Sequence, residues 1–440
     1  MSQTIALHEL SSLTADARVE LLRRAEDDLS PFIEKVAPLI EAVKTEGDAA
    51  LVRFAKQFDG ADIERIEATD KDFEAAYAQL DDELIDVLRY AADNIRRFHE
   101  KQMPQTQWMM EIQPGVNVGE RFTPIDSVAC YSPRGKGSFP SVTLMSLIPA
   151  VVAGVPEIIA LTPPGPNGEI DPATLVAADI SGVRKVYRAG GAQAVAAAAF
   201  GTQTIPKCVK IEGPGSPWLA AAKTLLANRI DPGMPAGPSE AIVFADESAT
   251  ARIAALDTII ESEHGDDSSV FLVTTSREIA EQAAKAIVEY WQEMSAERVN
   301  YSATVLGGTN GGIILAQNNQ QAYDFINDYA PEHLQILGQT PESHLPHIRN
   351  ASEILLGEHT PGSIANYMMG PNCVLPTSAA AKTRSPLGVH NFMKACSIGQ
   401  MTKSGFDEMA GPTHIFATYE GFDAHANAVS DMRRKAFGNK

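Results

Sequence analysis

Short β-prone segments alternate with alanine-rich helical segments from about residue 104 onward, and this alternation restricts the fold more than any other feature. The extended segments include SVACY, EIIALT, KVYRA, CVKIEG, EAIVFAD and SVFLVTT. Strands that alternate with helices at this spacing predict βαβ units and a parallel sheet. A glycine- and proline-rich segment at 231–239 interrupts the series, and strand-like segments return at GGIILAQ, HLQIL and EILLG. We therefore expect an α/β fold with two parallel sheets.

The residues before this alternation are expected to be helical. From about residue 17 to 105, apolar residues recur every three or four positions, as in Val36, Ile40 and Val43, which is the period of one helix face. Asp70 and Asp82 are placed to begin further helices. Nothing in this part suggests chemistry, so we predict a helical hairpin or small bundle.

Composition excludes several classes of protein. A chain of 440 residues with 44% hydrophobic and 21% charged residues is typical of a globular protein with more than one domain. The net charge of -20 argues against partners such as nucleic acid or an anionic membrane. The longest apolar run, around 147–155, is too short to span a bilayer, and the N-terminus lacks a signal-like apolar segment. We expect a cytoplasmic protein.

The cysteines argue against a structural role for sulfur. Cys130, Cys208, Cys373 and Cys396 are widely scattered and show no CxxC spacing. Both a disulfide framework and a thiolate zinc site are therefore unlikely from the sequence.

Two short acid–histidine segments are the best candidates for chemistry. In ESEH at 261–264, Glu261 and His264 are three residues apart at the end of a helical pattern. They therefore lie on one helix face and can share a metal ion. In PEHL at 331–334, the adjacent Glu332 and His333 lie in a predicted loop and can place two proton carriers beside one substrate carbon. Together the segments predict a metal site facing an acid–base site, which indicates an enzyme.

Each of these segments also has a structural explanation, and the residues alone leave both open. Acids and histidines are common at solvated helix ends, so Glu261 and His264 can be surface residues. In a loop, Glu332 can cap backbone amides while His333 packs. His425, in a predicted helix over 421–434, is by its context alone a surface residue.

Glycine-rich turns follow several predicted strands: YSPRGKG at 131–137, GGAQ at 190–193 and GPGS at 213–216. Glycines at a strand-to-helix turn let backbone amides approach a phosphate at the positive helix end. Each turn would lie at the carboxyl end of a strand, where open α/β sheets bind ligands. The GxGxxG fingerprint is absent, and tight helix–sheet packing is the alternative explanation. The repetition of such turns within one βαβ region favours a cofactor site.

A resemblance to a known family joins these motifs. The ordered segments GGAQAVAAAAFGT, IPK, GPG, AGPSE, ESEH, APEHL, GPNCVLPT and EGFDAH resemble the histidinol dehydrogenase family over about residues 131–429, and the helical N-terminal part fits as well. The resemblance implies a zinc-dependent homodimer that uses NAD without the usual glycine fingerprint. It also implies oxidation of L-histidinol through an aldehyde to L-histidine, a step of histidine biosynthesis.

Pattern and resemblance together imply the domain organisation. They predict two incomplete Rossmann-like parallel-sheet domains, an inserted helical domain and a short C-terminal tail that reaches the partner subunit. The first Rossmann-like domain, with the catalytic and metal residues, would comprise residues 1–27, 109–130 and 237–388; the NAD-side domain 131–236; the helical domain 28–108; and the tail 389–440.

The resemblance also implies roles for individual residues. His333 would take the alcohol proton during hydride transfer, and Glu332 would activate the water that attacks the aldehyde. These roles agree with general chemistry, because a histidine titrates near neutral pH and a neighbouring carboxylate can deprotonate water. The implied metal ligands are Glu261, His264, Asn366 and His425, the last of which lies in the tail that reaches the partner subunit; the implied NAD-site residues are Tyr131, Gln193 and Ser216; the implied substrate-site residues are Ser239, Glu420 and Cys373.

The chain departs from the family at several of these positions. The family's zinc shell is Gln, His, Asp and His, whereas Glu261 here replaces the amide and Asn366 replaces the acid. This exchange leaves the charge of the shell unchanged and still suits zinc. Cys373 stands where the family has a histidine, Ser216 where it has an asparagine, and PGM at 232–234 where it has IDM. We therefore expect intact chemistry with an altered substrate shell.

Three functions remain open from the sequence. The first is a zinc- and NAD-dependent dehydrogenase acting on L-histidinol. The second is the same chemistry on another polar alcohol, either an amino alcohol or an acidic diol such as a sulfonated one. Glu420 favours an amine-bearing substrate, because a carboxylate pairs with an ammonium group. The third is a non-catalytic, metal-binding homologue, which the intact Glu332–His333 pair argues against.

Overall fold

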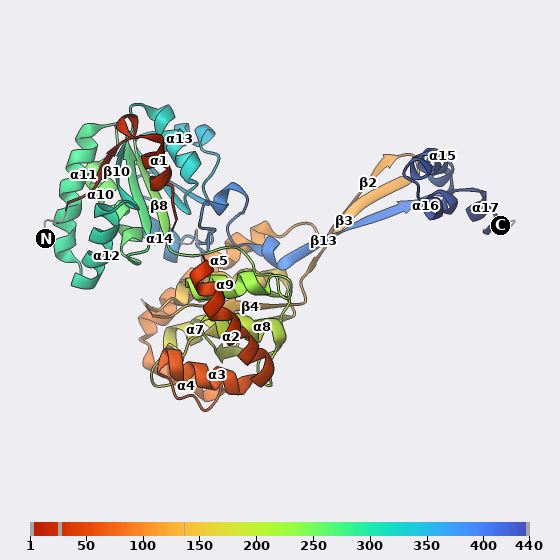
Figure 1. Ribbon diagram of the computed structural model, residues 1–440, viewed down its shortest axis with the longest axis horizontal. Coiled ribbons are helices and arrows are strands. Elements are labelled where there is room, and N and C mark those ends of the chain that lie inside the picture. The colour runs from red at the N-terminus through yellow and green to blue at the C-terminus, as the bar shows by residue number, and fades with distance from the viewer. Residues whose placement is uncertain (1–3, 25–28, 136, 437–440) are drawn as a thin grey trace. The chain divides into compact units, whose positions relative to one another are not determined.

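The computed structural model describes residues 4–24, 29–135 and 137–436. Contacts divide the chain into two compact units (Figure 1). Unit 1 comprises residues 1–103 and 125–392, and unit 2 comprises residues 104–124 and 393–440. Unit 1 contains both parallel sheets, and unit 2 contains an antiparallel sheet. The predicted α/β class with two parallel sheets is confirmed.

The larger sheet of unit 1 has the order β1-β10-β9-β8-β11-β12 and is parallel throughout. Its side chains alternate between two cores, because successive residues of a strand point to opposite faces. Val243 packs with helices α10, α11 and α12, and Phe244 packs with α1 and α13. Helices thus cover both faces, which explains the continuous apolar strands in the sequence. The strands are β1 (Leu7–Glu9), β8 (Glu240–Ala245), β9 (Ser269–Thr274), β10 (Gly311–Leu315), β11 (His333–Leu337) and β12 (Glu353–Leu356); the helices are α1 (Ala15–Leu21), α10 (Ala251–Ser262), α11 (Arg277–Tyr290), α12 (Ala296–Gly307), α13 (Asn319–Tyr329) and α14 (Gly362–Tyr367).

The smaller sheet of unit 1 has the order β6-β5-β4-β7 and is also parallel. One face carries α8 and α9; α2 packs on both of these helices, and α3 packs on α2. The other carries α6, against which α5 and α7 pack, and α4 packs on α7. The strands are β4 (Ser127–Tyr131), β5 (Glu157–Thr162), β6 (Val186–Arg188) and β7 (Lys210–Glu212); the helices are α2 (Ser30–Glu46), α3 (Asp48–Phe54), α4 (Asp70–Gln79), α5 (Asp82–Gln102), α6 (Pro140–Ala153), α7 (Pro172–Ser181), α8 (Gly191–Phe200) and α9 (Pro217–Leu226).

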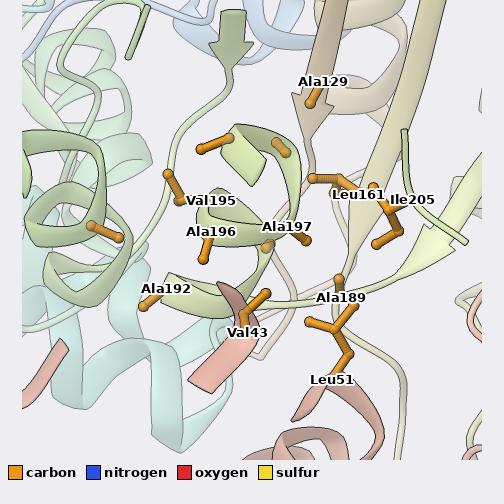
Figure 2. Close-up of a cluster of buried hydrophobic side chains, with 14 of the residues drawn as sticks. Val43, Leu51, Ala129, Leu161, Ala189, Ala192, Val195, Ala196, Ala197 and Ile205 are labelled. Atoms are coloured by element: carbon orange, nitrogen blue, oxygen red, sulfur yellow. The ribbon is translucent and has the colours of Figure 1, made fainter. Parts of the chain in front are cut away.

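The N-terminal helices have no core of their own. Val43 of α2 and Leu51 of α3 belong to the same buried cluster as Leu161 of β5 and Val195 of α8 (Figure 2). An amphipathic helix needs an apolar partner, and the smaller sheet and its helices supply it. The helical structure expected here is present, but the separate helical domain expected over 28–108 differs from this arrangement.

Unit 2 combines two segments that are far apart in the sequence. Strand β3 (Val116–Pro124) pairs along its length with β13 (Met393–Met401), and β2 (Gln107–Gln113) completes the sheet. The domain limits inferred from the sequence placed 109–130 with the larger sheet, whereas the structure places 109–124 with the tail and β4 in the smaller sheet.

Helices also complete unit 2. They are α15 (Lys403–Tyr419), α16 (Asp423–Ala428) and α17 (Asp431–Ala436). The continuous helix predicted over 421–434 is therefore wrong, since two short helices occupy that segment. None of the helices in the described part of the chain has the length and apolar character needed to cross a membrane.

A buried ion pair fastens the segment after α1 to the larger sheet. Arg24 Nε lies 3.0 Å from Glu240 Oε1, and both side chains are 4% exposed. The Arg24 guanidinium also lies 3.5 Å from the centroid of the Tyr329 ring and donates to the Tyr329 carbonyl oxygen. Loss of the cation would leave the Glu240 carboxylate buried without it, which is strongly unfavourable.

We expect Arg24→Ala to lower the free energy of unfolding by about 3–5 kcal/mol, measured as the shift of the denaturant unfolding curve. Arg23→Ala is the matched control. Arg23 is 62% exposed and pairs with Glu20 on the surface of α1, so its loss should change the free energy by less than about 1 kcal/mol. Equal effects of the two substitutions would contradict the prediction.

Candidate active site

The candidate residues meet at the amino-terminal edge of the larger sheet. Ser239 directly precedes β8, and His333 and Glu353 are the first residues of β11 and β12. The register pairs His333 with Ala241 on one side and Glu353 on the other. Helix α10 connects β8 to β9, so its end returns to the same edge. That return brings the ESEH segment to the starts of the neighbouring strands.

The chain enters this edge through a sharp turn after α13. Ala330 ends the helix with φ 53° and ψ 66°, a left-handed conformation that non-glycine residues adopt rarely. Glu332 and His333 follow and are only 7% and 9% exposed. The prediction that this pair lies in a loop is wrong for His333, which begins a buried parallel strand. The strand fixes its position more firmly than a loop would.

The Glu332–His333 pair is held by specific hydrogen bonds. Glu332 Oε2 accepts a hydrogen bond from the backbone N–H of Glu240 at 3.0 Å. His333 Nδ1 lies 2.8 Å from Glu353 Oε2, and His333 Nε2 lies 3.8 Å from Glu332 Oε1. One ring nitrogen is therefore occupied by Glu353, and the other faces Glu332.

Burial and charge shift the pKa values of this pair. Burial raises the pKa of the Glu332 carboxyl to about 8, although the neighbouring imidazole opposes the shift. Burial disfavours the His333 imidazolium, but the carboxylates of Glu261, Glu332 and Glu353 outweigh it and raise the pKa of His333 to about 10. In the protein without metal, the pair therefore holds protons more tightly than the same residues in an unfolded chain.

Glu261, His264 and Asn366 form a polar cluster at the end of α10. Glu261 Oε2 lies 2.9 Å from His264 Nδ1, and Asn366 Nδ2 donates to Glu261 Oε1 at 2.9 Å. Ser239 Oγ lies 2.8 Å from His264 Nδ1. Burial opposes ionisation of Glu261, yet His264 and His333 hold its pKa far below the usual range. The same carboxylate raises the pKa of His264.

The residues of this cluster fit a divalent metal ion. Glu261 Oε2 and Asn366 Oδ1 are buried and have no hydrogen-bond partner; Glu261 Oε2 is near His264 but outside hydrogen-bonding geometry. Buried oxygens without partners are rare and often mark an ion site. Imidazole nitrogen and carboxylate oxygen are ligands that zinc prefers. Within the described ranges, no three His, Cys, Asp or Glu side chains could hold a metal by themselves; the third member of this cluster, Asn366, offers an amide oxygen instead.

The remaining predicted site residues of the tail belong to unit 2. His425 is an exposed residue of α16, and its ring centroid lies 5.3 Å from that of Phe422. Glu420 is the exposed C-terminal cap of α15. Their predicted roles in metal and substrate binding therefore stay predictions.

The glycine-rich turns lie where the sequence predicted them, at the carboxyl ends of β4, β6 and β7. The Tyr131 hydroxyl at the end of β4 accepts a hydrogen bond from the Gly191 amide at 3.1 Å. Gln193 is buried on α8, and Ser216 is the exposed N-cap of α9. A Cβ at Gly213 would lie 2.1 Å from the Tyr131 carbonyl oxygen. Close packing thus requires this glycine, whether or not a cofactor binds beside it.

One residue of the site was missed in the sequence. Glu353 contacts His333 and also accepts a hydrogen bond from Cys373 Sγ at 3.6 Å. The available signal was an acid at the start of the apolar segment EILLG, since acids are almost never fully buried without a partner.

Comparisons with known proteins agree with this architecture. Residues 22–433 match the family described as Histidinol dehydrogenase. A protein of Colwellia psychrerythraea described as "Histidinol dehydrogenase homolog" is 57% identical over 99% of this chain and 98% of its own length. The "Histidinol dehydrogenase" of Synechocystis is 44% identical over 96% of this chain and 98% of its own. The crystal structure of histidinol dehydrogenase from Elizabethkingia anophelis superposes with a TM-score of 0.92 and 32% identity over 99% of each chain.

The raised pKa of His333 predicts a pH dependence of stability in the metal-free protein. Because the pKa is about 10 in the folded state and 6.5 ordinarily, proton binding stabilises the fold fully below pH 6.5. This contribution is lost as the pH rises towards 10. The melting temperatures of metal-free wild type and His333→Asn should therefore differ most near pH 6.5 and converge towards pH 10. A difference that stays constant with pH would contradict the prediction.

Proposed function

The chain belongs to the histidinol dehydrogenase family, and we propose that it is a zinc- and NAD-dependent dehydrogenase that oxidises a primary alcohol through an aldehyde to a carboxylate. The observation that carries the proposal is the buried Glu332–His333 pair at the strand edge to which the cluster of Glu261, His264 and Asn366 also belongs. A pair of titrating groups beside potential metal ligands is suited to removing a proton from an alcohol and then from water. The proposed protein is thus a cytoplasmic enzyme of small-molecule metabolism.

Glu261, His264 and Asn366 are the residues of unit 1 that would hold zinc, with His425 proposed as a further ligand. Their buried oxygens without hydrogen bonds support this role. Bound zinc would supply a Lewis acid that orients the alcohol and lowers the pKa of its hydroxyl. Ser239 lies beside His264, and we propose that its hydroxyl forms a hydrogen bond with the same substrate.

His333 and Glu332 would divide the proton transfers between them. The Nδ1 atom of His333 is bonded to Glu353, so Nε2 is the nitrogen that takes the alcohol proton as the alcohol is oxidised. Glu332 would remove a proton from the water that attacks the aldehyde. Burial raises the pKa of its carboxyl above the ordinary value in the metal-free protein, which favours acceptance of a proton, and the Glu240 amide donates to one of its oxygens.

Tyr131, Gln193 and Ser216 are proposed to hold NAD at the carboxyl edge of the smaller sheet. The support is the convergence of glycine-rich turns and of the start of α8 at that edge, where backbone amides suit a pyrophosphate. Bound NAD would supply the hydride acceptor for both oxidations.

L-histidinol is the first substrate to consider, and a different polar alcohol is the second. Cys373 favours the different polar alcohol. Its thiol donates a hydrogen bond to Glu353 inside the site and cannot offer an imidazole to a ligand. The names of the relatives also support a different substrate. The relative at 57% identity is described as a histidinol dehydrogenase homolog, and the one at 44% identity as histidinol dehydrogenase itself. An amino alcohol would pair with Glu420, whereas an acidic diol such as a sulfonated one would need a cationic partner instead.

A homodimer is proposed to complete the site. Unit 2 exposes large apolar side chains that an isolated subunit would leave in water: Met110, Ile112, Ile415, Phe416 and Tyr419. Exposed apolar clusters of this kind mark protein–protein contacts. In a two-fold dimer the same surface is buried on both subunits, and each tail can bring His425 to the other subunit.

The function is tested by NADH formation from purified, zinc-loaded protein and L-histidinol. We expect two NADH per histidinol and loss of turnover after chelator treatment. No turnover of histidinol, with turnover of another amino alcohol or an acidic diol, would keep the chemistry and change the substrate. Absence of turnover with every alcohol of the panel despite bound zinc would contradict the proposed enzyme and favour a non-catalytic metal-binding homologue.

The division of labour between the two bases predicts different defects. His333→Asn should abolish alcohol oxidation with little change in zinc content, because His333 is not among the proposed ligands. Glu332→Gln should slow oxidation of the aldehyde by about 100-fold or more, so that the NADH yield per alcohol falls from two towards one. His359→Asn, at an exposed histidine outside the site, is the control and should leave both steps unchanged. Similar losses in the two steps for Glu332→Gln would argue against a specific role in water activation.

A further inference from the structure

Glu353 is a buried acid that directly faces the proposed base. The register of β11 and β12 places Glu353 opposite His333, and the Glu353 amide donates to the Glu332 carbonyl oxygen at 3.1 Å. Register partners on neighbouring strands point to the same face, so their side chains meet. Glu353 Oε2 accordingly lies 2.8 Å from His333 Nδ1, and the Glu353 side chain is only 7% exposed.

The other oxygen of Glu353 is also fixed. Cys373 Sγ donates to Glu353 Oε1 at 3.6 Å, and the Cys373 amide contacts Met145 Sδ at 3.1 Å. A carboxylate buried to this degree usually has a basic partner. Glu240, at the start of a neighbouring strand, is such a case and pairs with Arg24. The described partners of Glu353 are instead an imidazole and a thiol, so its charge is directed at His333.

A carboxylate can only accept a hydrogen bond at Nδ1, and it therefore selects the imidazole tautomer that carries its proton there. The lone pair of the neutral ring then lies on Nε2, the nitrogen that faces Glu332 at 3.8 Å. Acid–histidine pairs of this geometry orient a catalytic imidazole and stabilise its protonated form without taking the proton.

We propose that Glu353 is a positioning residue that holds His333 as the Nδ1–H tautomer with Nε2 free to take the alcohol proton, and that Cys373 fixes Glu353 for this task. In the alcohol oxidation, the C–H electron pair leaves as hydride to NAD+, and the O–H proton goes to Nε2. The products are the aldehyde, NADH and an imidazolium that faces the Glu353 carboxylate. The inference rests on the proposed function, since it requires His333 to be the base.

The test compares Glu353→Gln with wild type in the zinc-loaded, full-length protein. The Gln amide has nearly the same shape, but it can donate to Nδ1 and so permits the wrong tautomer. We expect kcat for alcohol oxidation to fall about 100-fold or more, while KM and zinc content change less than about 3-fold. The acid limb of kcat against pH should move to lower pH, because one carboxylate facing the ring is removed. The carboxylates of Glu261 and Glu332 still act on the ring in the variant.

Asp246→Asn is the matched control. Asp246 Oδ2 lies 3.3 Å from His344 Nε2, which is a second buried acid–histidine pair of the same sheet and lies at the end of β8 opposite to the site. This substitution should lower the melting temperature without moving kcat or the pH profile. Glu353→Asp, which keeps the carboxylate, should recover part of kcat and restore the acid limb towards that of wild type.

Two outcomes would overturn the inference. One is a kcat of Glu353→Gln within about two-fold of wild type with an unmoved acid limb. The other comes from NMR of protein labelled with 15N-histidine, in which the signal missing from His333→Asn identifies the residue. At alkaline pH the neutral ring should carry its proton on Nδ1 in wild type, and a proton on Nε2 would overturn the inference. The NMR result does not need turnover, so it separates a failure of this inference from a failure of the proposed function.

Discussion

Burial of several carboxylates at one edge of the larger sheet is the constraint on which the site depends. An ionised carboxylate is strongly destabilised in a protein interior unless hydrogen-bond donors or a cation lie beside it. Here each acid has a partner from a different element: Glu240 has Arg24, Glu332 has a backbone amide, and Glu353 has His333. Only the parallel register of β8, β11 and β12 brings these partners within reach, so the charge balance of the site depends on the fold.

Glu261 is the exception, because its contacts leave one buried carboxylate oxygen without a hydrogen bond. His264 and Asn366 reach it, but one of its oxygens and the amide oxygen of Asn366 remain without hydrogen bonds. The exchange of acid and amide between these two positions, relative to the family pattern, keeps a single carboxylate in the shell. Because electrostatic attraction to a divalent ion depends mainly on ligand charge and type, such an exchange is compatible with the proposed metal site. The replacement at Cys373 differs from this exchange, because a thiol there in place of an imidazole changes the groups available to a substrate.

The two sheets of unit 1 use opposite edges for their proposed tasks. The glycine turns proposed to receive NAD lie at the carboxyl ends of β4, β6 and β7, as is usual for open α/β sheets. The acid–base residues lie at the amino ends of β8, β11 and β12, where helices that run back along the sheet deliver the ESEH segment and the turn at Ala330 delivers Glu332. A polar site at this edge requires irregular backbone and buried charge, which explains why it contains the left-handed Ala330 and the shifted pKa values.

The sequence by itself determined the α/β class, the parallel sheets and the residues of the ESEH and PEHL segments, because hydrophobic periodicity and short motifs are local properties. It did not reveal that the helices over 30–102 share a core with the smaller sheet, that β3 belongs with β13, or that helix 421–434 is broken. Those outcomes depend on contacts between distant segments, which leave no local pattern. Glu353 is the clearest case. In the sequence it is one acid before an apolar run, and only the pairing of β12 with β11 turns it towards His333. A shift of the register by one residue would point it to the other face, so the tertiary structure alone decided that this acid belongs to the site.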